Sequence, residues 1–209
     1  MIRFFNAFVK ITGFLPQRLV FRTKVFYENK AAQSRRIKGN AIIISNHTSV
    51  WDYAAFLFVF FSRTLRYQMA ELLFKKKLLG WFLRSMGGIY VNRDTHDFSF
   101  MAKSEEILSA GGVVGIFPES RLPREGEARP LPFVPSAAYL ALHSGAKVIP
   151  VYTNGKYFTR ERAKVVIGEP IDVSMLYDEG ISEKENLRKI TETLRERVIS
   201  LGKRIDEEG

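Results

Sequence analysis

Residues 41–52 read Ala-Ile-Ile-Ile-Ser-Asn-His-Thr-Ser-Val-Trp-Asp, a short apolar run followed by a polar turn. The run Ala41–Ser45 is continuous and rich in β-branched residues, which predicts a strand buried on both faces. The residues after it are turn and N-cap formers, and a helix is predicted from Asp52 onward. A strand that leads through a short turn into a helix is the repeating unit of α/β folds.

The same alternation continues along the chain. Strands are predicted at 65–70, 89–91, 113–117, 148–152 and 164–167, and helices at 52–61, 71–84, 97–110 and 136–144. Strands that alternate with helices predict an α/β fold with a mostly parallel sheet covered by helices on both faces. A last helix is predicted after Ser182, which forms a capping box with Glu185, and one apolar stripe runs along it.

The first 32 residues differ from the rest in composition, because they are rich in Phe and contain one acidic residue, Glu28. Gly13 and Pro16 divide them into two predicted helical stretches, about 3–12 and 16–32. Aromatic residues on one side of a helix and basic residues on the other are typical of a helix in a membrane interface. The alternative is an aromatic stripe that packs on the core. We expect an amphipathic two-helix membrane-binding motif over 1–32, followed by an α/β domain over 33–209.

The 209-residue chain carries a net charge of +10 and contains no Cys. Its length fits one domain. The charge is unevenly distributed, with +14 over residues 1–168 and −4 over residues 169–209. A basic body suits nucleic acid, an anionic membrane or a phosphorylated substrate. The lack of Cys excludes a disulfide scaffold, a thiolate nucleophile and a zinc site built on Cys.

The longest uninterrupted apolar run, Ala54–Phe61, has eight residues. A membrane-spanning helix needs about 20. Basic residues interrupt every apolar stretch near the N-terminus that could form the core of a signal peptide. We therefore expect an intracellular protein with no membrane span.

His47 and Asp52 are five residues apart, so a single continuous helix would place them on different faces. They can meet if His47 lies in the turn and Asp52 in the first helical turn. Such a pair supplies the base and the orienting carboxylate of acyl-transfer chemistry. The sequence has no G-x-S-x-G elbow, so we infer that a hydroxyl of the substrate attacks the acyl group directly. The alternative is a helix-capping histidine beside an ordinary surface aspartate.

Four sequence blocks occur in order between residues 46 and 151. The first is N-H-x-x-x-x-D, from Asn46 to Asp52. The others are Gly87–Asp94 (GGIYVNRD), Phe117–Arg121 (FPESR) and Val148–Val151 (VIPV). Together they resemble the PlsC-type glycerolipid acyltransferases, the 1-acyl-sn-glycerol-3-phosphate or lysophosphatidic acid acyltransferases.

The resemblance implies a role for each matching residue. His47 corresponds to the general base and Asp52 to its partner. The planar guanidinium of Arg93 corresponds to the group that binds the phosphate of the acceptor, because it can hold two phosphate oxygens at once. The residues of the third block are implied to help place the glycerol phosphate, and they are Glu119, Ser120 and Arg121.

The resemblance also implies a reaction. A fatty acyl group moves from a thioester, acyl-CoA or acyl carrier protein, to the hydroxyl of lysophosphatidic acid. The product is phosphatidic acid, an intermediate of phospholipid biosynthesis. No cofactor and no metal are implied, and nucleic acid is not an expected partner. The expected location is peripheral or monotopic, on the phospholipid surface of the cytoplasmic face of a membrane.

The third block departs from the family pattern. The chain has E-S-R where the family usually has E-G-T-R, and Phe133–Ser136 (FVPS) replaces the usual F-K-x-G. These changes concern phosphate recognition more than the base. An acyltransferase acting on another acceptor, such as glycerol-3-phosphate, another lysophospholipid or a glycolipid, is therefore an alternative. A second alternative is a non-catalytic peripheral protein that binds anionic lipid.

Overall fold

The computed structural model describes residues 1–92 and 97–207. The elements follow one another in chain order as α1 (Ile2–Val20), β1 (Lys24–Tyr27), β2 (Ala41–Ser45), α2 (Asp52–Val59), β3 (Leu65–Ala70), α3 (Glu71–Lys75), α4 (Lys77–Met86), β4 (Ile89–Val91), α5 (Ser99–Ser109), β5 (Val113–Ile116), α6 (Ser136–Ser144), β6 (Lys147–Thr153), β7 (Lys164–Ile167), the 3-10 helix η1 (Val173–Leu176) and α7 (Glu183–Glu207).

The described strands form one sheet in the order β1-β7-β6-β2-β5-β3-β4. The five strands from β6 to β4 are parallel to one another, whereas β7 is antiparallel to β6 and β1 is parallel to β7. The mostly parallel sheet predicted from the sequence is therefore confirmed. Strand β2 lies between β5 and β6, so the segments that leave the carboxyl ends of these strands emerge side by side.

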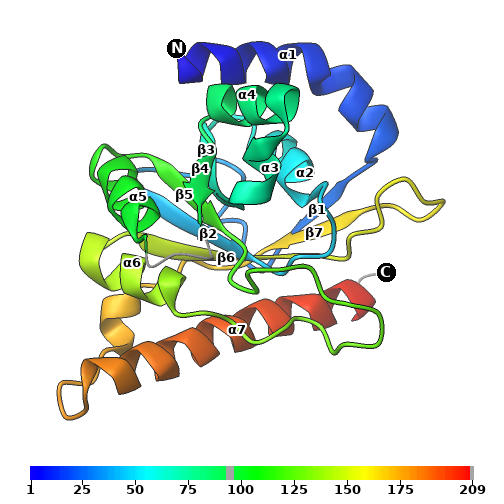
Figure 1. Cartoon of the computed structure of the whole chain (residues 1–209). Coiled ribbons are helices and arrows are strands. Elements are labelled where there is room, and N and C mark those ends of the chain that lie inside the picture. The colour runs from blue at the N-terminus through cyan, green and yellow to red at the C-terminus, as the bar shows by residue number, and fades with distance from the viewer. Residues whose placement is uncertain (93–96, 208–209) are drawn as a thin grey trace.

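Helices cover both faces of this sheet (Figure 1). The side chains of β2 show why, because they alternate between two apolar clusters and all are buried. Ile43 packs in the cluster that includes residues of α2, α3 and α4. Ile42 and Ile44 pack in the cluster that includes residues of α5, α6 and α7. A strand buried on both sides has no polar alternation, which is the pattern that the sequence shows.

The expected second N-terminal helix over 16–32 is wrong. Helix α1 continues through Pro16 to Val20, and Lys24–Tyr27 forms strand β1 at the edge of the sheet. Figure 1 shows that α1 bends in its second half, as expected when a proline removes a backbone donor from a helix. The sequence Lys-Val-Phe-Tyr suits an extended strand, and β7 provides its parallel partner. The predicted division after residue 32 therefore separates β1 from its own sheet.

Helix α1 turns polar side chains toward the protein. Lys10 is buried, and its Nζ donates to the carbonyl oxygens of Phe60 and Phe61 at 3.3 and 3.2 Å. The buried Asn6 donates from Nδ2 to the carbonyl oxygen of Met86 at 2.8 Å. These carbonyls lie at or just beyond the C-terminal ends of α2 and α4, where acceptors lack helical partners. The opposite side of α1 is apolar and exposed, with Phe4, Phe8, Ile11, Phe14, Leu15 and Leu19.

The predicted helix over 71–84 is two helices in the structure, α3 and α4. Lys76 has extended backbone angles and separates them. At Gly80 a Cβ atom would overlap the carbonyl oxygen of Phe74, so the glycine permits the close packing of the two helices. Within residues 1–92 and 97–207, no helix has both the length and the apolar character needed to cross a membrane.

Candidate active site

The His47 and Asp52 side chains meet, as predicted. Nδ1 of His47 lies 2.9 Å from Oδ2 of Asp52. His47 follows β2 in the turn, and Asp52 is the first residue of α2. The carboxylate can only accept, so Nδ1 carries the hydrogen and Nε2 keeps a free lone pair. The imidazole is thus held in the tautomer that a general base needs.

The Asp52 carboxylate is completely buried and surrounded by donors from its own turn. Its Oδ2 accepts the backbone amides of Thr48 and Ser49 at 2.7 and 2.9 Å. Its Oδ1 accepts the Thr48 hydroxyl at 2.9 Å. A buried charge needs such donors to offset the loss of water. The turn and N-cap residues noted in the sequence therefore serve the aspartate directly.

Glu119 fixes the backbone of the turn. It follows β5, and its side chain is buried. Oε1 accepts the backbone amide of His47 at 2.7 Å, and Oε2 accepts that of Leu131 at 2.7 Å. Burial raises the pKa of the Glu119 carboxyl, and the two amide hydrogen bonds oppose that rise. Both oxygens are used by the protein, and placement of the acceptor by Glu119 stays a prediction.

Asn46 ties the turn to the neighbouring strand β6. Its Nδ2 donates to the carbonyl oxygen of Thr153 at 2.8 Å, and its Oδ1 accepts the amide of Thr153 at 2.9 Å. Both residues are buried. In the sequence, Asn46 is a turn former at the start of the first block. The partners are 107 residues apart in the sequence, so no local pattern indicates this contact.

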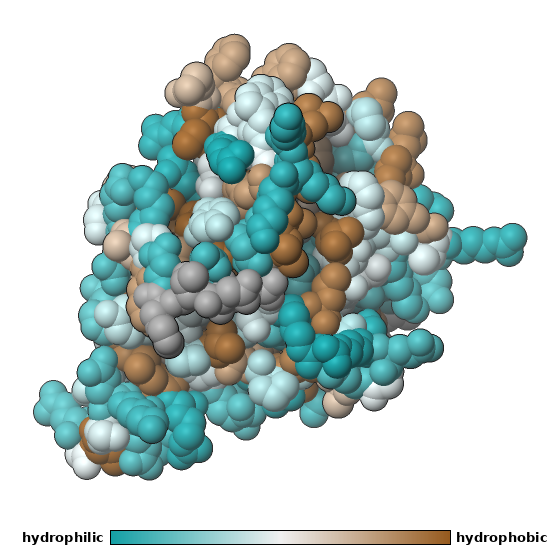
Figure 2. Space-filling model, viewed as in Figure 1, coloured by the Kyte–Doolittle hydropathy of each residue, from teal (hydrophilic) through white to brown (hydrophobic). Residues whose placement is uncertain are grey.

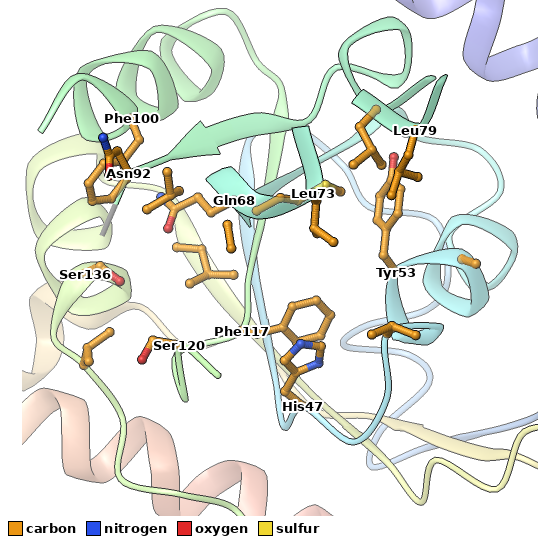
Figure 3. A pocket seen from close by; sticks show the side chains of 18 of the residues that line it. His47, Tyr53, Gln68, Leu73, Leu79, Asn92, Phe100, Phe117, Ser120 and Ser136 are labelled. Atoms are coloured by element: carbon orange, nitrogen blue, oxygen red, sulfur yellow. The ribbon is translucent and has the colours of Figure 1, made fainter. Parts of the chain in front are cut away.

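Phe117 packs flat against the His47 ring. The ring centroids are 4.2 Å apart, and the planes differ by 12°. This contact limits rotation of the imidazole, and both rings border the same cavity (Figure 3). The two rings come from the turns after β2 and β5, which are adjacent in the sheet. In the sequence, Phe117 ends a predicted strand and opens the third block, and neither feature indicates this contact.

The remaining predicted site residues lie in different environments. Ser120 borders the cavity described below and has a positive φ of 56°, at the position where the family pattern has Gly. The backbone amide of Ser120 donates to the carbonyl oxygen of Phe117 at 3.0 Å. Arg121 forms a two-pronged ion pair with Glu127, at 2.7 and 2.8 Å. Arg93 lies outside the described residues.

A cavity of about 750 Å³ opens in front of His47, and Figure 3 shows side chains from several elements pointing into it. Its size falls within the range of small-molecule sites. Most of its lining is apolar and comes from α2, β3, α3, α4, β4, α5 and the turn after β5. The residues that line it include Tyr53, Met69, Leu73, Leu79, Phe82, Leu83, Val91, Phe98 and Phe100. The His47–Asp52 pair therefore faces a space suited to a hydrocarbon chain.

In the part of the chain that the structure describes, no three His, Asp or Glu side chains are grouped so that they could hold a metal ion. The site consequently offers a base, an orienting carboxylate and an apolar cavity. These groups can remove a proton from a substrate that brings its own nucleophile.

Comparison with known proteins identifies the class of this site. The family model for acyltransferases matches residues 24–154, which include the dyad and the strands that carry it. The chain belongs to the acyltransferase family. The acyltransferase activity predicted from the four sequence blocks is thereby confirmed at the level of the family.

Three curated relatives of this acyltransferase are each named 1-acyl-sn-glycerol-3-phosphate acyltransferase. The protein from Bacillus subtilis is 26% identical over 148 residues, which are 68% of this chain and 71% of the relative. The protein from Borreliella burgdorferi is 29% identical over 164 residues, 73% of this chain and 63% of the relative. The one from Streptococcus pneumoniae is 24% identical over 177 residues, 81% and 61% respectively. The chain thus spans between 61% and 71% of their lengths.

A crystal structure of the 1-acyl-sn-glycerophosphate acyltransferase PlsC from Thermotoga maritima shares the fold of this acyltransferase. The TM-score is 0.66, and the match covers 97% of this chain and 78% of that chain, with 22% sequence identity. The match extends beyond the family model to nearly the whole chain, so the fold described above is that of a known enzyme.

Proposed function

We propose that this acyltransferase moves a fatty acyl group from an acyl thioester to the hydroxyl of 1-acyl-sn-glycerol-3-phosphate, giving phosphatidic acid. The observation that carries the proposal is the contact between His47 and the buried Asp52 at the mouth of an apolar cavity. The names of the curated relatives support the choice of acceptor. Either acyl-CoA or acyl carrier protein fits the basic body of the chain as the donor, because both are anionic.

The proposed reaction uses His47 as the base and Asp52 as its partner. Asp52 holds Nδ1, so Nε2 takes the proton of the acceptor hydroxyl while the oxygen bonds to the carbonyl carbon of the thioester. The tetrahedral intermediate collapses, the C–S bond breaks, and the imidazolium gives its proton to the departing thiolate. The products are an ester and a free thiol. The Asp52 charge stabilises the imidazolium that exists between these two proton transfers.

The cavity supports a long acyl chain as the group transferred. It extends from His47 past Tyr53 and Met69 to Leu79 and Phe82. Burial of each methylene of a chain in such a space contributes about 0.8 kcal/mol. The reacting carbonyl would lie beside His47 while the chain is held among these side chains. The binding of the donor then places its carbonyl within reach of the base.

We also propose that α1 places the enzyme on a membrane surface, at its cytoplasmic face. Exposed hydrophobic side chains of α1, among them Phe4, Phe8 and Ile11, point away from the protein, and Figure 2 shows such side chains on the face where α1 lies. Leu78 and Trp81 of α4 are exposed as well, next to the basic run Lys75–Lys77. Apolar insertion combined with attraction to anionic lipid is the requirement for stable interfacial binding. Because β1 belongs to the sheet, the proposed membrane segment is limited to α1.

The second candidate function is the same chemistry on another acceptor. Arg121, which the resemblance assigns to the acceptor, is engaged at both guanidinium nitrogens by the carboxylate of Glu127. A guanidinium in such a pair is not available to two phosphate oxygens. This pair therefore favours acceptors without a phosphate monoester, such as other lysophospholipids or a glycolipid, and the altered third block keeps glycerol-3-phosphate as a further competing acceptor. A variant, Glu127→Gln, frees Arg121 and tests whether the preference for a phosphorylated acceptor increases.

The test is an acyl-transfer assay that crosses acyl-CoA and acyl carrier protein with lysophosphatidic acid, glycerol-3-phosphate, a neutral lysophospholipid and a glycolipid acceptor. Thiol release and labelled lipid product are both measured. We expect the highest kcat/KM with lysophosphatidic acid and no turnover by His47→Ala. Wild-type rates in His47→Ala would refute the mechanism. Vesicle binding without thiol release from any donor would instead support a non-catalytic lipid-binding protein.

A further inference from the structure

The turn between β6 and β7 packs against the segment that carries His47. Thr153, the last residue of β6, exchanges two hydrogen bonds with the side chain of Asn46. Two residues later, Gly155 has a φ of +65°, and a Cβ atom there would overlap the Thr48 side chain. Thr48 in turn donates to Asp52. The turn is therefore in direct contact with the residues on both sides of the catalytic histidine.

Tyr157 lies two residues further along this connection, and its side chain is buried. The ring packs with Ala55, which is three residues after Asp52 on the same side of α2, and with Phe21 at a centroid distance of 5.5 Å. Burial raises the pKa of the Tyr157 hydroxyl, and the negative charge of Asp52 raises it further. The phenol therefore keeps its hydrogen, and it faces a carboxylate that can only accept one.

The hydrogen bonds of the turn set the direction in which the Tyr157 hydroxyl points its hydrogen. The amide of Gly155 donates to Oγ1 of Thr153 at 3.2 Å. Thr153 Oγ1 and the Tyr157 hydroxyl oxygen are 3.1 Å apart. With Thr153 accepting from the amide and donating to the phenol oxygen, the phenol hydrogen is left for Asp52. A chain directed in this way from Gly155 through Thr153 to Tyr157 would end at Asp52, whose charge acts on the phenol.

We propose that Tyr157 is a positioning residue of the dyad, whose hydroxyl donates to the Asp52 carboxylate and limits how strongly Asp52 attracts the proton of His47. The proposal rests on the proposed function of His47 as a base. A carboxylate that shares its charge with an additional donor is a weaker partner for an imidazolium. Without the hydroxyl, Asp52 would hold the imidazolium more strongly and His47 would lose its proton at higher pH.

Other titratable groups also face the dyad and must stay unchanged in the test. Among the described residues they are Glu119, which bonds to the His47 backbone, and the buried Tyr53 and Tyr67. Tyr67 is the matched control for Tyr157. Its ring is buried and its hydroxyl is close enough to Asp52 to feel its charge, yet within residues 1–92 and 97–207 that hydroxyl has no hydrogen-bond partner.

The experiment compares Tyr157→Phe and Tyr67→Phe with the wild-type enzyme. The first readout is the pH dependence of kcat/KM. The second is NMR titration of the His47 ring, which is practical because the chain has three histidines. In Tyr157→Phe we expect the acid limb and the ring titration midpoint to rise by about 0.5 pH unit. We expect kcat to fall about tenfold with KM unchanged, because Tyr157 is not among the described residues that line the cavity. Tyr67→Phe should match wild type in every readout.

An unchanged midpoint and an unchanged acid limb in Tyr157→Phe would overturn the inference, as would an equal shift in Tyr67→Phe. If Tyr157→Phe does not fold, Thr153→Val carries the test, with a smaller shift in the same direction expected and no shift overturning it. The NMR readout needs no turnover. A wild-type protein without transferase activity, or an active His47→Ala, therefore refutes the proposed function while the ring titration still decides the place of Tyr157 behind the dyad.

Discussion

Replacement of Asp52 by Asn removes the charge of the orienting carboxylate and leaves its shape. Three donors converge on Oδ2, namely Nδ1 of His47 and the amides of Thr48 and Ser49. The amide oxygen of the new side chain must therefore take the Oδ2 position. Its nitrogen then faces Oγ1 of Thr48, which can accept a hydrogen bond. We expect Asp52→Asn to fold with the His47 tautomer unchanged.

The geometry sets the size of the effect. A hydrogen bond to a charged acceptor stabilises a protein by about 1 kcal/mol more than one to a neutral acceptor. Because the three hydrogen bonds to Oδ2 would lose a charged acceptor, the free energy of unfolding should fall by about 3 kcal/mol. For catalysis, the imidazolium and the carboxylate are 2.9 Å apart. Unit charges at that distance attract by about 6 kcal/mol at an effective dielectric constant of about 20. At about 1.4 kcal/mol for each tenfold, this bounds the loss of kcat at about 10⁴.

The assay is thiol release under saturating donor and acceptor, combined with urea unfolding of the same preparations. We expect kcat to fall between about 10² and 10⁴, because the amide dipole replaces part of the lost attraction. His47→Ala gives the lowest rate of thiol release that we expect, against which the other variants are compared. A folded Asp52→Asn enzyme with kcat within threefold of wild type would refute the role given to the carboxylate.

Three further predictions concern the surroundings of the dyad and the membrane surface. In Glu119→Gln, one of the two amides that bond to the carboxylate loses its acceptor, so the free energy of unfolding falls by about 1–3 kcal/mol. Burial raises the pKa of the Glu119 carboxyl, so the contribution of this group to the free energy of unfolding declines as pH rises through the raised pKa. Over that pH range the difference in urea stability between wild type and Glu119→Gln should shrink. A difference that widens with pH would contradict this prediction. Gly155→Ala should lower both thermal stability and kcat, because the added Cβ atom would overlap the Thr48 side chain. Gly39 has a similar positive φ but open space around it, so the control Gly39→Ala should lower thermal stability only slightly. Equal effects of the two variants on thermal unfolding and thiol release would argue against the contact between Gly155 and Thr48. Ile11→Asp should weaken binding to anionic vesicles about tenfold. Thermal stability should not change, because Ile11 is exposed on α1. Unchanged sedimentation of this variant with vesicles would show that this side of α1 does not contact the membrane.

The sequence predicted the architecture well where a pattern is local. The run Ala41–Ser45 predicted a doubly buried strand, and the alternation that follows predicted the mostly parallel sheet, both confirmed here. The failures lie where tertiary contacts override local preference. Pro16 does not end α1, and Lys24–Tyr27 becomes a strand because β7 offers it an edge. No pattern within residues 16–32 indicates that β7 will pair with this segment.

The site shows the same division. The His47–Asp52 contact could be predicted because both residues belong to one turn and its first helical turn. The contacts made by Glu119 and Thr153 with this turn connect segments that are 72 and 107 residues apart. Such contacts follow from the order of strands in the sheet, which a single sequence does not specify. The sequence therefore predicted the contact between His47 and Asp52 but not the contacts that hold their turn in place.

The most direct test of the account is whether the enzyme itself ever carries the acyl group. Wild-type protein is mixed with a saturating acyl thioester in the absence of acceptor, and its intact mass and released thiol are followed; acceptor is then added. Because the proposed mechanism uses His47 as a base on the hydroxyl of the acceptor, we predict an unchanged protein mass and rapid thiol release only after acceptor is added. A mass increase equal to one acyl group, or a burst of thiol stoichiometric with enzyme before the acceptor is present, would contradict direct transfer.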